Sequence, residues 1–172
     1  LVGNCTAVEA RARSEEAGFD VLPGNGDLTA AEVELMEVNQ REQRLLKALE
    51  PIRDEYDYIL IDCPPSLNML TVNAMACANG ILVPMQCEYY ALEGISALLN
   101  TVKLIKNSLN PGLVIEGILR TMYDPRNSLT NDVSHQLINH LSEFDRFNGL
   151  KQQTITHFIN PLFQLLRMIR SD

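Results

Sequence analysis

The sequence predicts an α/β fold in which a doubly wound, mostly parallel sheet is flanked by helices. Strand and helix patterns alternate at least four times along the 172 residues, which calls for parallel strands joined by right-handed crossovers. The strand patterns are short, nearly continuous apolar runs, as expected for strands buried on both faces. Hydrophobic residues make up 46% of the chain, enough for a sizeable core. We therefore expect one α/β domain over residues 1–172.

The first part of the chain predicts one short strand between two helices. Residues 8–17 are polar and charged and indicate a helix or the end of one. Residues 19–22 are a short apolar run, closed by a Pro-Gly-Asn-Gly turn sequence. Thr29 and Glu32 have the spacing of a capping box, so we expect a long helix to begin there and to end near residue 50.

The middle of the chain carries the clearest periodicity. We expect a strand at residues 58–61, a helix over 67–78, a strand at 81–84, a helix over 91–108, a turn at 110–112 and a strand over 113–121. Asn79-Gly80 follows the first of these helices, and this pair is typical of a helix C-terminus.

Toward the C-terminus the pattern changes. Residues 128–141 predict another helix, whereas residues 142–156 are polar and aromatic without a clear strand. Asn160-Pro161 is typical of a helix start. Its apolar face would consist of Leu162, Leu165, Leu166 and Ile169. We expect this terminal helix to pack against the rest of the fold.

Composition narrows the class of protein. The net charge of −8 argues against a broad electrostatic grip on nucleic acid. No apolar run is long enough to span a membrane. The four cysteines show no CxxC pair and three lie in or beside apolar segments, so we expect buried free thiols and a reducing cytoplasm.

One stretch predicts a functional site. The apolar run at residues 58–61 ends in Asp62 and is followed by Pro64-Pro65, which cannot continue a strand ladder. Asp62 should therefore stand at the carboxyl end of a buried strand, where open α/β sheets bind their ligands. A carboxylate in that position is a candidate for holding the water shell of a metal ion.

Three sequence strings carry a family resemblance. They are Ile61-Asp62-Cys63-Pro64-Pro65-Ser66, the segment 83–94 (Val-Pro-Met-Gln-Cys-Glu-Tyr-Tyr-Ala-Leu-Glu-Gly) and Thr121-Met122-Tyr123-Asp124. Together, and in this order, they resemble the ParA/Soj family, the deviant-Walker ATPases that partition chromosomes and plasmids and are related to MinD. The resemblance covers roughly residues 19–141.

The resemblance implies a P-loop NTPase fold and a cytoplasmic, nucleoid-associated ATPase that binds ATP and Mg²⁺. It also implies a homodimer that binds DNA without sequence preference, and a ParB-type partner that stimulates hydrolysis. Asp62 would be the Walker B carboxylate, and Cys63, Pro64, Pro65 and Ser66 would be the switch II loop. Thr121 and Met122 would border the adenine pocket, although Met122 alone is equally compatible with an ordinary core position.

The chain also departs from the family pattern. It has no Lys-Gly-Gly-x-Gly-Lys-Thr-Thr loop and no Asp-x-Asp-Pro-Gln segment, and Gly24-Asn25-Gly26 is a turn. We therefore expect a partial P-loop NTPase domain, truncated at the N-terminus, with a divergent C-terminal segment over residues 142–172. The missing first strand is central in the family's sheet, so an unpaired edge and exposed apolar surface should result.

Three functional hypotheses follow. The chain is part of a partition ATPase, or a non-hydrolysing interaction module that kept the sheet, or a relative that positions another cargo, as in MinD-like placement or cellulose synthesis. In each case we expect residues 1–172 alone to bind ATP very weakly and not to hydrolyse it, because the phosphate-binding loop is missing.

Overall fold

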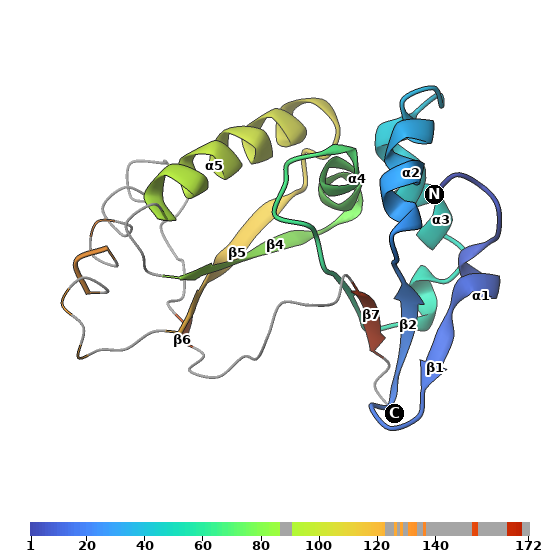
Figure 1. The fold of residues 1–172 in the computed structure, drawn as a ribbon, viewed down its shortest axis with the longest axis horizontal. Helices are drawn as coiled ribbons and strands as arrows, with labels where there is room; N and C mark the ends of the chain where they lie inside the picture. The colour runs from blue at the N-terminus through green and yellow to red at the C-terminus, as the bar shows by residue number, and fades with distance from the viewer. Residues whose placement is uncertain are drawn as a thin grey trace. The chain divides into compact units, whose positions relative to one another are not determined.

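The computed structural model describes residues 1–86 and 91–122, the positions 126, 128, 131–133 and 136, and the short segments 153–154 and 165–169 (Figure 1). The chain divides into two compact units. The first unit consists of Leu1–Ala78 together with Pro161–Asp172, and the second consists of Asn79–Asn160. Each unit contains one sheet and its own helices, so the α/β class predicted from the sequence is confirmed.

The first unit opens with a single helical turn and a hairpin. Helix α1 covers Ala7–Ala10 and is followed by strand β1 (Ala12–Ser14), which pairs antiparallel with β2 (Phe19–Pro23). The predicted helix over residues 8–17 is therefore wrong beyond Ala10. The capping box of Thr6 and Glu9 stabilises one turn only, and the following residues bond to β2 instead.

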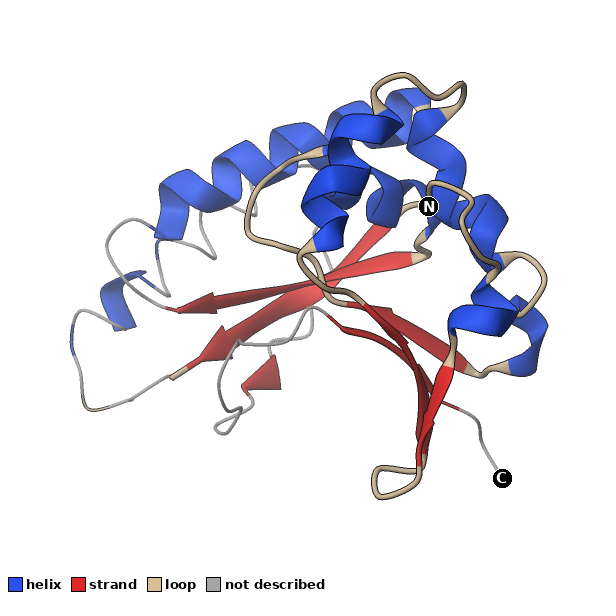
Figure 2. Cartoon of the chain, turned by 45° about the vertical axis from the view of Figure 1, so that its right-hand side comes forward, coloured by secondary structure: helices blue, strands red, loops and turns tan. Residues whose placement is uncertain are grey.

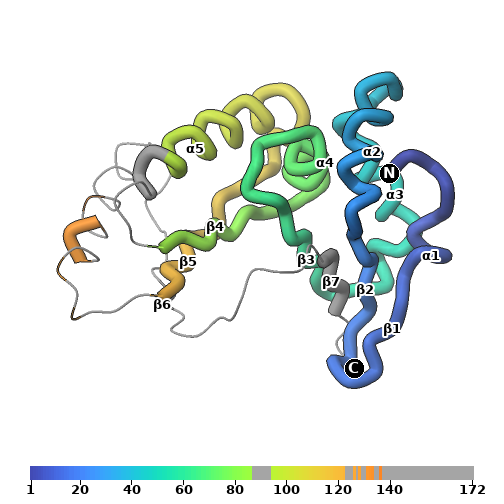
Figure 3. The backbone as a smooth tube through the Cα atoms, viewed as in Figure 1, coloured from blue at the N-terminus to red at the C-terminus, as the bar shows by residue number. Residues whose placement is uncertain are grey.

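The predicted long helix between residues 29 and 50 is also wrong, because it is broken into three pieces. These are α2 (Asp27–Leu35), the short 3₁₀ turn η1 (Arg41–Gln43) and α3 (Arg44–Leu49) (Figure 3). Between them Gln40 has a left-handed backbone, with φ of 55°. The Thr29 capping box does not form either, since α2 begins two residues earlier, at Asp27.

The side chain of Asn73 accounts for the break between η1 and α3. In a continuous helix the Leu45 N–H would donate to the Arg41 carbonyl. Here the Asn73 Oδ1 accepts from the Leu45 N–H at 3.0 Å, and the Asn73 Nδ2 donates to the Arg41 carbonyl at 2.7 Å. The amide of Asn73 is thus inserted into the helical ladder, and it is only 1% exposed.

After the 3₁₀ turn η2 (Arg53–Glu55) come strand β3 (Tyr58–Ile61) and helix α4 (Met69–Cys77), both as predicted. Within the first unit, Leu49 and Ile52 form a core cluster with Ala7. Leu22 of β2 and Ile59 of β3 pack against it, so both strands direct one face toward the helices.

The second unit agrees with the predicted strand, helix, turn and strand. Its elements are β4 (Gly80–Gln86), α5 (Ala91–Ser108), β5 (Val114–Thr121) and β6 (Gln153–Thr154), with β4 parallel to β5 and β5 parallel to β6. Helix α5 lies along one face of this sheet (Figure 2). Its buried residues Ile95, Leu99, Val102 and Ile105 form the core with Met85 and Leu113.

Helix α4 ends at Cys77, just before the Asn79-Gly80 pair as predicted, and Gly80 is also the first residue of β4. A Cβ at this position would lie 2.5 Å from the Cγ of Glu116 on the neighbouring strand. The glycine therefore permits a close approach between β4 and β5.

The C-terminal predictions fare differently. The helix over residues 128–141 lies mostly outside the described residues. The terminal helix is wrong at Leu165–Ile169, which form strand β7. The stretch 142–156, predicted to lack strands, contributes the two residues of β6. In both places the backbone pairs with strand edges of the fold, which local helix or loop propensity does not indicate.

Strands β3 and β4 each stand at the end of their own sheet, paired on one side among the described residues. Large apolar side chains are exposed beside these edges: Tyr58 and Leu60 on β3 are 67% and 51% exposed, and Leu82 on β4 is 58% exposed. In each unit, exposed apolar side chains therefore lie on a strand that is paired on one side only among the described residues.

Candidate functional site

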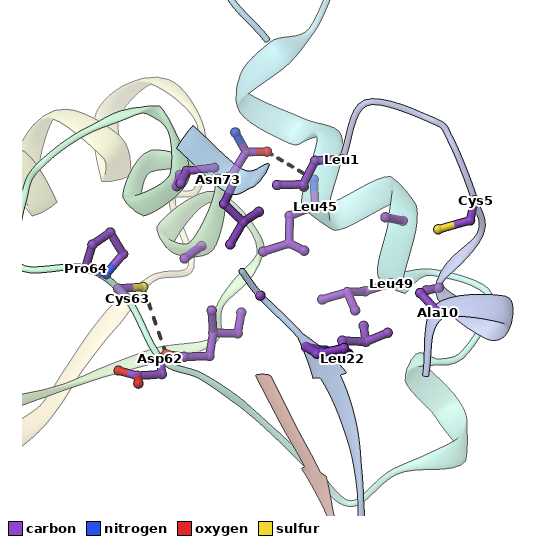
Figure 4. Close-up of a pocket in the computed structure, with 18 of the residues that line it drawn as sticks. Leu1, Cys5, Ala10, Leu22, Leu45, Leu49, Asp62, Cys63, Pro64 and Asn73 are labelled. Atoms are coloured by element: carbon purple, nitrogen blue, oxygen red, sulfur yellow. Dashed lines mark hydrogen bonds between the residues drawn. The ribbon is translucent and has the colours of Figure 1, made fainter. Parts of the chain in front are cut away.

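Asp62 stands where the sequence predicts it, directly after the last residue of β3. Its side chain is exposed, and in the described part of the chain its carboxylate makes no hydrogen bond or ion pair. Figure 4 shows the carboxylate pointing away from Leu22 and Leu49. Asp62 is therefore a free carboxylate at a strand end, available to a ligand without first breaking an internal contact.

The loop behind Asp62 is held at the start of α4. Thr71, which is 5% exposed, donates from its hydroxyl to the Ser66 carbonyl at 2.7 Å. The Asn68 side chain caps the helix by accepting from the Thr71 N–H at 3.1 Å. Both ends of the loop are thus fixed, by β3 at one end and by the helix cap at the other, while Pro65 and Ser66 between them are exposed.

Glu32 of α2 adds a second support to this cap. Its two carboxylate oxygens accept from the Asn68 side-chain amide at 3.1 Å and from the Met69 N–H at 3.3 Å. A negative charge beside the first turn of α4 also matches the positive end of the helix dipole. The sequence spacing predicted that Glu32 caps the helix that contains it, but in the structure Glu32 caps α4.

An apolar pocket of about 290 Å³ opens beside the loop. Its wall includes Asp62, Cys63 and Pro64 on one side and Leu22, Leu45 and Leu49 on the other (Figure 4). Asn73 lines it as well and fixes α3 against α4. The pocket is mostly apolar, so it suits a hydrophobic side chain better than a phosphate.

The thiol of Cys63 is partly buried in this site. Burial, together with the nearby charge of Asp62, raises the pKa of Cys63 to about 11. Burial similarly raises the pKa of Cys77 to about 11. Cys5 is exposed, which corrects the expectation of buried thiols for that residue, and Cys87 lies outside the described residues.

Thr121 and Met122 belong to the second unit, at the end of β5. Met122 is 78% exposed and has a positive φ of 51°, so it is not a core methionine. The Gln86 side-chain amide contacts its sulfur at 3.2 Å, which links the ends of the neighbouring strands β4 and β5. This places both residues at the carboxyl edge of the second sheet.

The residues of the site do not by themselves fit Mg·ATP. Across the described residues no group of three His, Cys, Asp or Glu side chains could hold a metal ion. The sequence 1–172 has no Gly-x-x-x-x-Gly-Lys-Thr/Ser loop to cradle phosphates. Asp62 supplies one carboxylate, and the other groups that a nucleotide requires are not among these residues.

Comparison with known proteins defines the family. A family model described as "AAA domain" matches residues 1–115. An uncharacterized protein of Pseudomonas putida is 61% identical over 140 residues, covering 81% of this chain and 53% of that protein. The chromosome partitioning protein ParA of Caulobacter vibrioides is 47% identical over 145 residues, covering 83% of this chain and 54% of its own length. The chain thus spans about half the length of these relatives.

Among solved structures, cobyrinic acid a,c-diamide synthase from Mycobacterium smegmatis with bound ADP and magnesium matches with a TM-score of 0.77 and 34% identity. The match covers 91% of this chain and 62% of that enzyme. This structural similarity assigns the fold of the chain to the P-loop NTPase class. The chain belongs to the AAA domain family, and within it to the ParA/Soj group of partition ATPases.

Sequence reasoning found Asp62 and its loop but missed the residues that hold the loop. Thr71 and Asn73 lie on an apolar helix pattern with no charge to mark them. Polar residues inside an otherwise apolar helix are the available signal, because a buried polar side chain has to find hydrogen-bond partners.

In the described region no helix is long and apolar enough to cross a membrane.

Proposed function

We propose that residues 1–172 are part of a ParA/Soj-like ATPase that partitions chromosomes or plasmids as a nucleotide-dependent dimer. The observation that carries this proposal is the free Asp62 carboxylate at the end of β3, followed by a loop fixed at the α4 cap, in a chain 47% identical to a chromosome partitioning protein. The proposed surroundings are the cytoplasm and the nucleoid. The proposed partners are DNA and a ParB-type protein.

Asp62 has the proposed role of Walker B carboxylate, which acts on Mg²⁺ through a water. Cys63 to Ser66 are proposed as the switch II loop. Fixed loop ends with exposed residues between them suit a segment that changes conformation with the nucleotide state. Thr121 and Met122 are proposed to border the adenine, which their position at a strand end supports.

Nucleotide binding by residues 1–172 alone is expected to be very weak, with no hydrolysis. Phosphate-binding backbone amides and lysines contribute most of the affinity for Mg·ATP in such sites, and this stretch does not contain them. Calorimetric titration of residues 1–172 with Mg·ATP tests this expectation. Micromolar binding would overturn it.

Reading the DNA upstream of Leu1 tests the proposed function itself. We expect an in-frame Lys-Gly-Gly-x-Gly-Lys-Thr-Thr segment. A start codon immediately before Leu1 would instead favour an interaction module that does not hydrolyse ATP. If the segment is present, ATP turnover should be measured for the protein that includes it.

In that protein, Asp62→Asn should lower ATP turnover at least tenfold, because it removes the charge that the magnesium water shell requires. The matched control is Asp54→Asn, which removes another exposed carboxylate, from η2. Equal turnover by the two variants would contradict the role proposed for Asp62.

A further inference from the structure

Helix α2 turns an apolar face away from the core of the first unit. Its inner side is formed by Ala31 and Leu35, which are 8% and 0% exposed. A helix advances about 100° per residue, so Ala30, Val33 and Met36 lie on the opposite side. Val33 is 70% exposed and Met36 is 58% exposed. These three residues, which we call the outer face of α2, form a contiguous apolar patch rather than scattered single residues.

The border of this outer face is acidic. Glu34 and Glu37 are exposed, and among the described residues neither takes part in an ion pair. Residues 24–40 contain carboxylates but no lysine or arginine. The next basic residue along the chain, Arg41, pairs with Glu42 at 3.1 Å. The apolar patch is therefore surrounded by negative charge that no neighbouring cation in this segment balances.

Several contacts hold the outer face in a fixed conformation. The Glu32 carboxylate accepts from the Asn68 side chain and from the Met69 N–H, which ties α2 to the start of α4. At the end of α2, Arg41 donates to the Met36 carbonyl at 3.0 Å and contacts its sulfur at 3.9 Å. A surface that is already ordered loses little conformational entropy when a partner binds.

Charge and backbone geometry decide what kind of partner fits. Nucleic acids and anionic lipid surfaces carry the same sign of charge and would be repelled. Two copies of α2 packed on each other would bring Glu34 and Glu37 of both chains together. A helix surface has no free backbone edge to pair with a strand, but its side-chain ridges accept the grooves of another helix. The surface therefore favours a helix with an apolar stripe flanked by lysine or arginine.

We propose that the outer face of α2 is a docking surface for a short, basic amphipathic helix of a partner protein. The apolar side chains of that helix pack on Val33 and Met36, and its cations meet Glu34 and Glu37. This proposal does not depend on the proposed ATPase function.

Peptide titration tests the role of the acidic border. The probe is a fluorescein-labelled peptide of two heptads with leucine on one face and lysine on the other, and anisotropy reports its binding. Glu34→Gln with Glu37→Gln should weaken binding roughly fivefold or more at low salt. The matched control, Glu15→Gln with Glu16→Gln, removes two exposed carboxylates from the turn between β1 and β2 and should leave the affinity unchanged. Equal weakening by both double variants would reduce the binding to general attraction and overturn the proposal.

A second pair of variants tests the apolar patch with the same peptide. Val33→Ser should weaken binding roughly fivefold, because it removes apolar contact area at the centre of the surface. Leu104→Ser on α5 is the control, since Leu104 is 68% exposed and belongs to the second unit. Equal affinities of these two variants would contradict docking on α2.

The remaining occupants of the surface are distinguished by two further measurements. Sedimentation of the chain alone should give the same mass for Val33→Ser as for the unchanged sequence, whereas a lower mass would identify a second copy as the occupant. The titration should also be repeated with the protein that includes any residues encoded before Leu1 or after Asp172. Unchanged affinity is expected, and loss of binding would show that the protein's own segments cover the outer face. Either contrary result would overturn the proposal.

Discussion

The Tyr56 hydroxyl donates a 2.6 Å hydrogen bond to the Asp20 carboxylate and thereby ties β2 to the segment that leads into β3. Asp20 is 7% exposed and also accepts from Arg13 at 3.1 Å, while Arg11 donates to the Tyr56 hydroxyl at 3.0 Å. A buried carboxylate requires such donors because it has lost its water. This network joins two parts of the sheet that have no backbone bonds to each other.

Removing that hydroxyl should destabilise the first unit. Tyr56→Phe leaves the ring in the core but takes one donor from a buried charge, which costs about 1.5–3 kcal/mol. Urea unfolding followed by circular dichroism measures the change. Tyr58→Phe is the matched control, because Tyr58 is 67% exposed and should change the free energy of unfolding by less than about 0.5 kcal/mol. Similar losses for both variants would show that the Asp20 contact contributes nothing.

Asn73→Ala should be among the more damaging substitutions in the first unit. It leaves the Leu45 N–H and the Arg41 carbonyl without their partner, and each buried unsatisfied group costs about 1–3 kcal/mol. Thermal and urea unfolding should show the loss. Asn100→Ala on the exposed face of α5 serves as control. If α2 and α3 merge into one helix in the variant, the loss will be smaller, and increased helical ellipticity will reveal it.

The elements predicted correctly are those whose signal is local. Strands β3, β4 and β5 are apolar runs, and α5 shows its periodicity within its own 18 residues. The break between η1 and α3 was not predictable in this way, because Asn73 acts on Leu45 from 28 residues away. Strand β7 was not predictable from local sequence either. Its apolar residues have helical spacing, but its backbone pairs with both β2 and β3, and these pairing partners lie far away in the sequence.

The same distinction applies to the site. Asp62 was predictable because an apolar strand ending in a carboxylate and two prolines is visible in a single stretch. The groups that fix its loop come from elsewhere in the chain, as Glu32 and Asn68 lie 36 residues apart. Sequence spacing predicted that Glu32 caps the nearest helix start, near Thr29. In the fold its carboxylate instead lies at the start of α4, where it accepts two hydrogen bonds.

Glu32→Gln should weaken the cap of α4 and loosen the loop that follows Asp62. The variant removes the charge beside the helix N-terminus and one of two acceptors, so we expect a loss of about 0.5–1.5 kcal/mol. Hydrogen exchange at Met69 should accelerate more than exchange elsewhere in the unit. Glu34→Gln, exposed on the same helix, is the control. Unchanged protection at Met69 would argue against a capping role.

Alkylation of Cys63 should depend steeply on pH. With its pKa raised to about 11, only roughly one thiol in a thousand is ionised at pH 8, and each further pH unit increases that fraction tenfold. Iodoacetamide labelling with peptide mapping should therefore modify the exposed Cys5 first and Cys63 slowly, with the difference shrinking toward pH 11. Equal labelling of Cys5 and Cys63 at pH 8 would refute the raised pKa.

The raised pKa values of Cys63 and Cys77 also predict that the free energy of unfolding decreases at alkaline pH. Above the ordinary thiol value of 9.0, the unfolded chain releases these protons while the folded chain still holds them at Cys63 and Cys77. Stability that is present in full below pH 9 is therefore lost progressively as the pH rises toward 11. Urea midpoints at pH 8 and pH 10 should show the decrease. The double variant Cys63→Ala with Cys77→Ala should show a smaller one, since its side chains carry no proton to release.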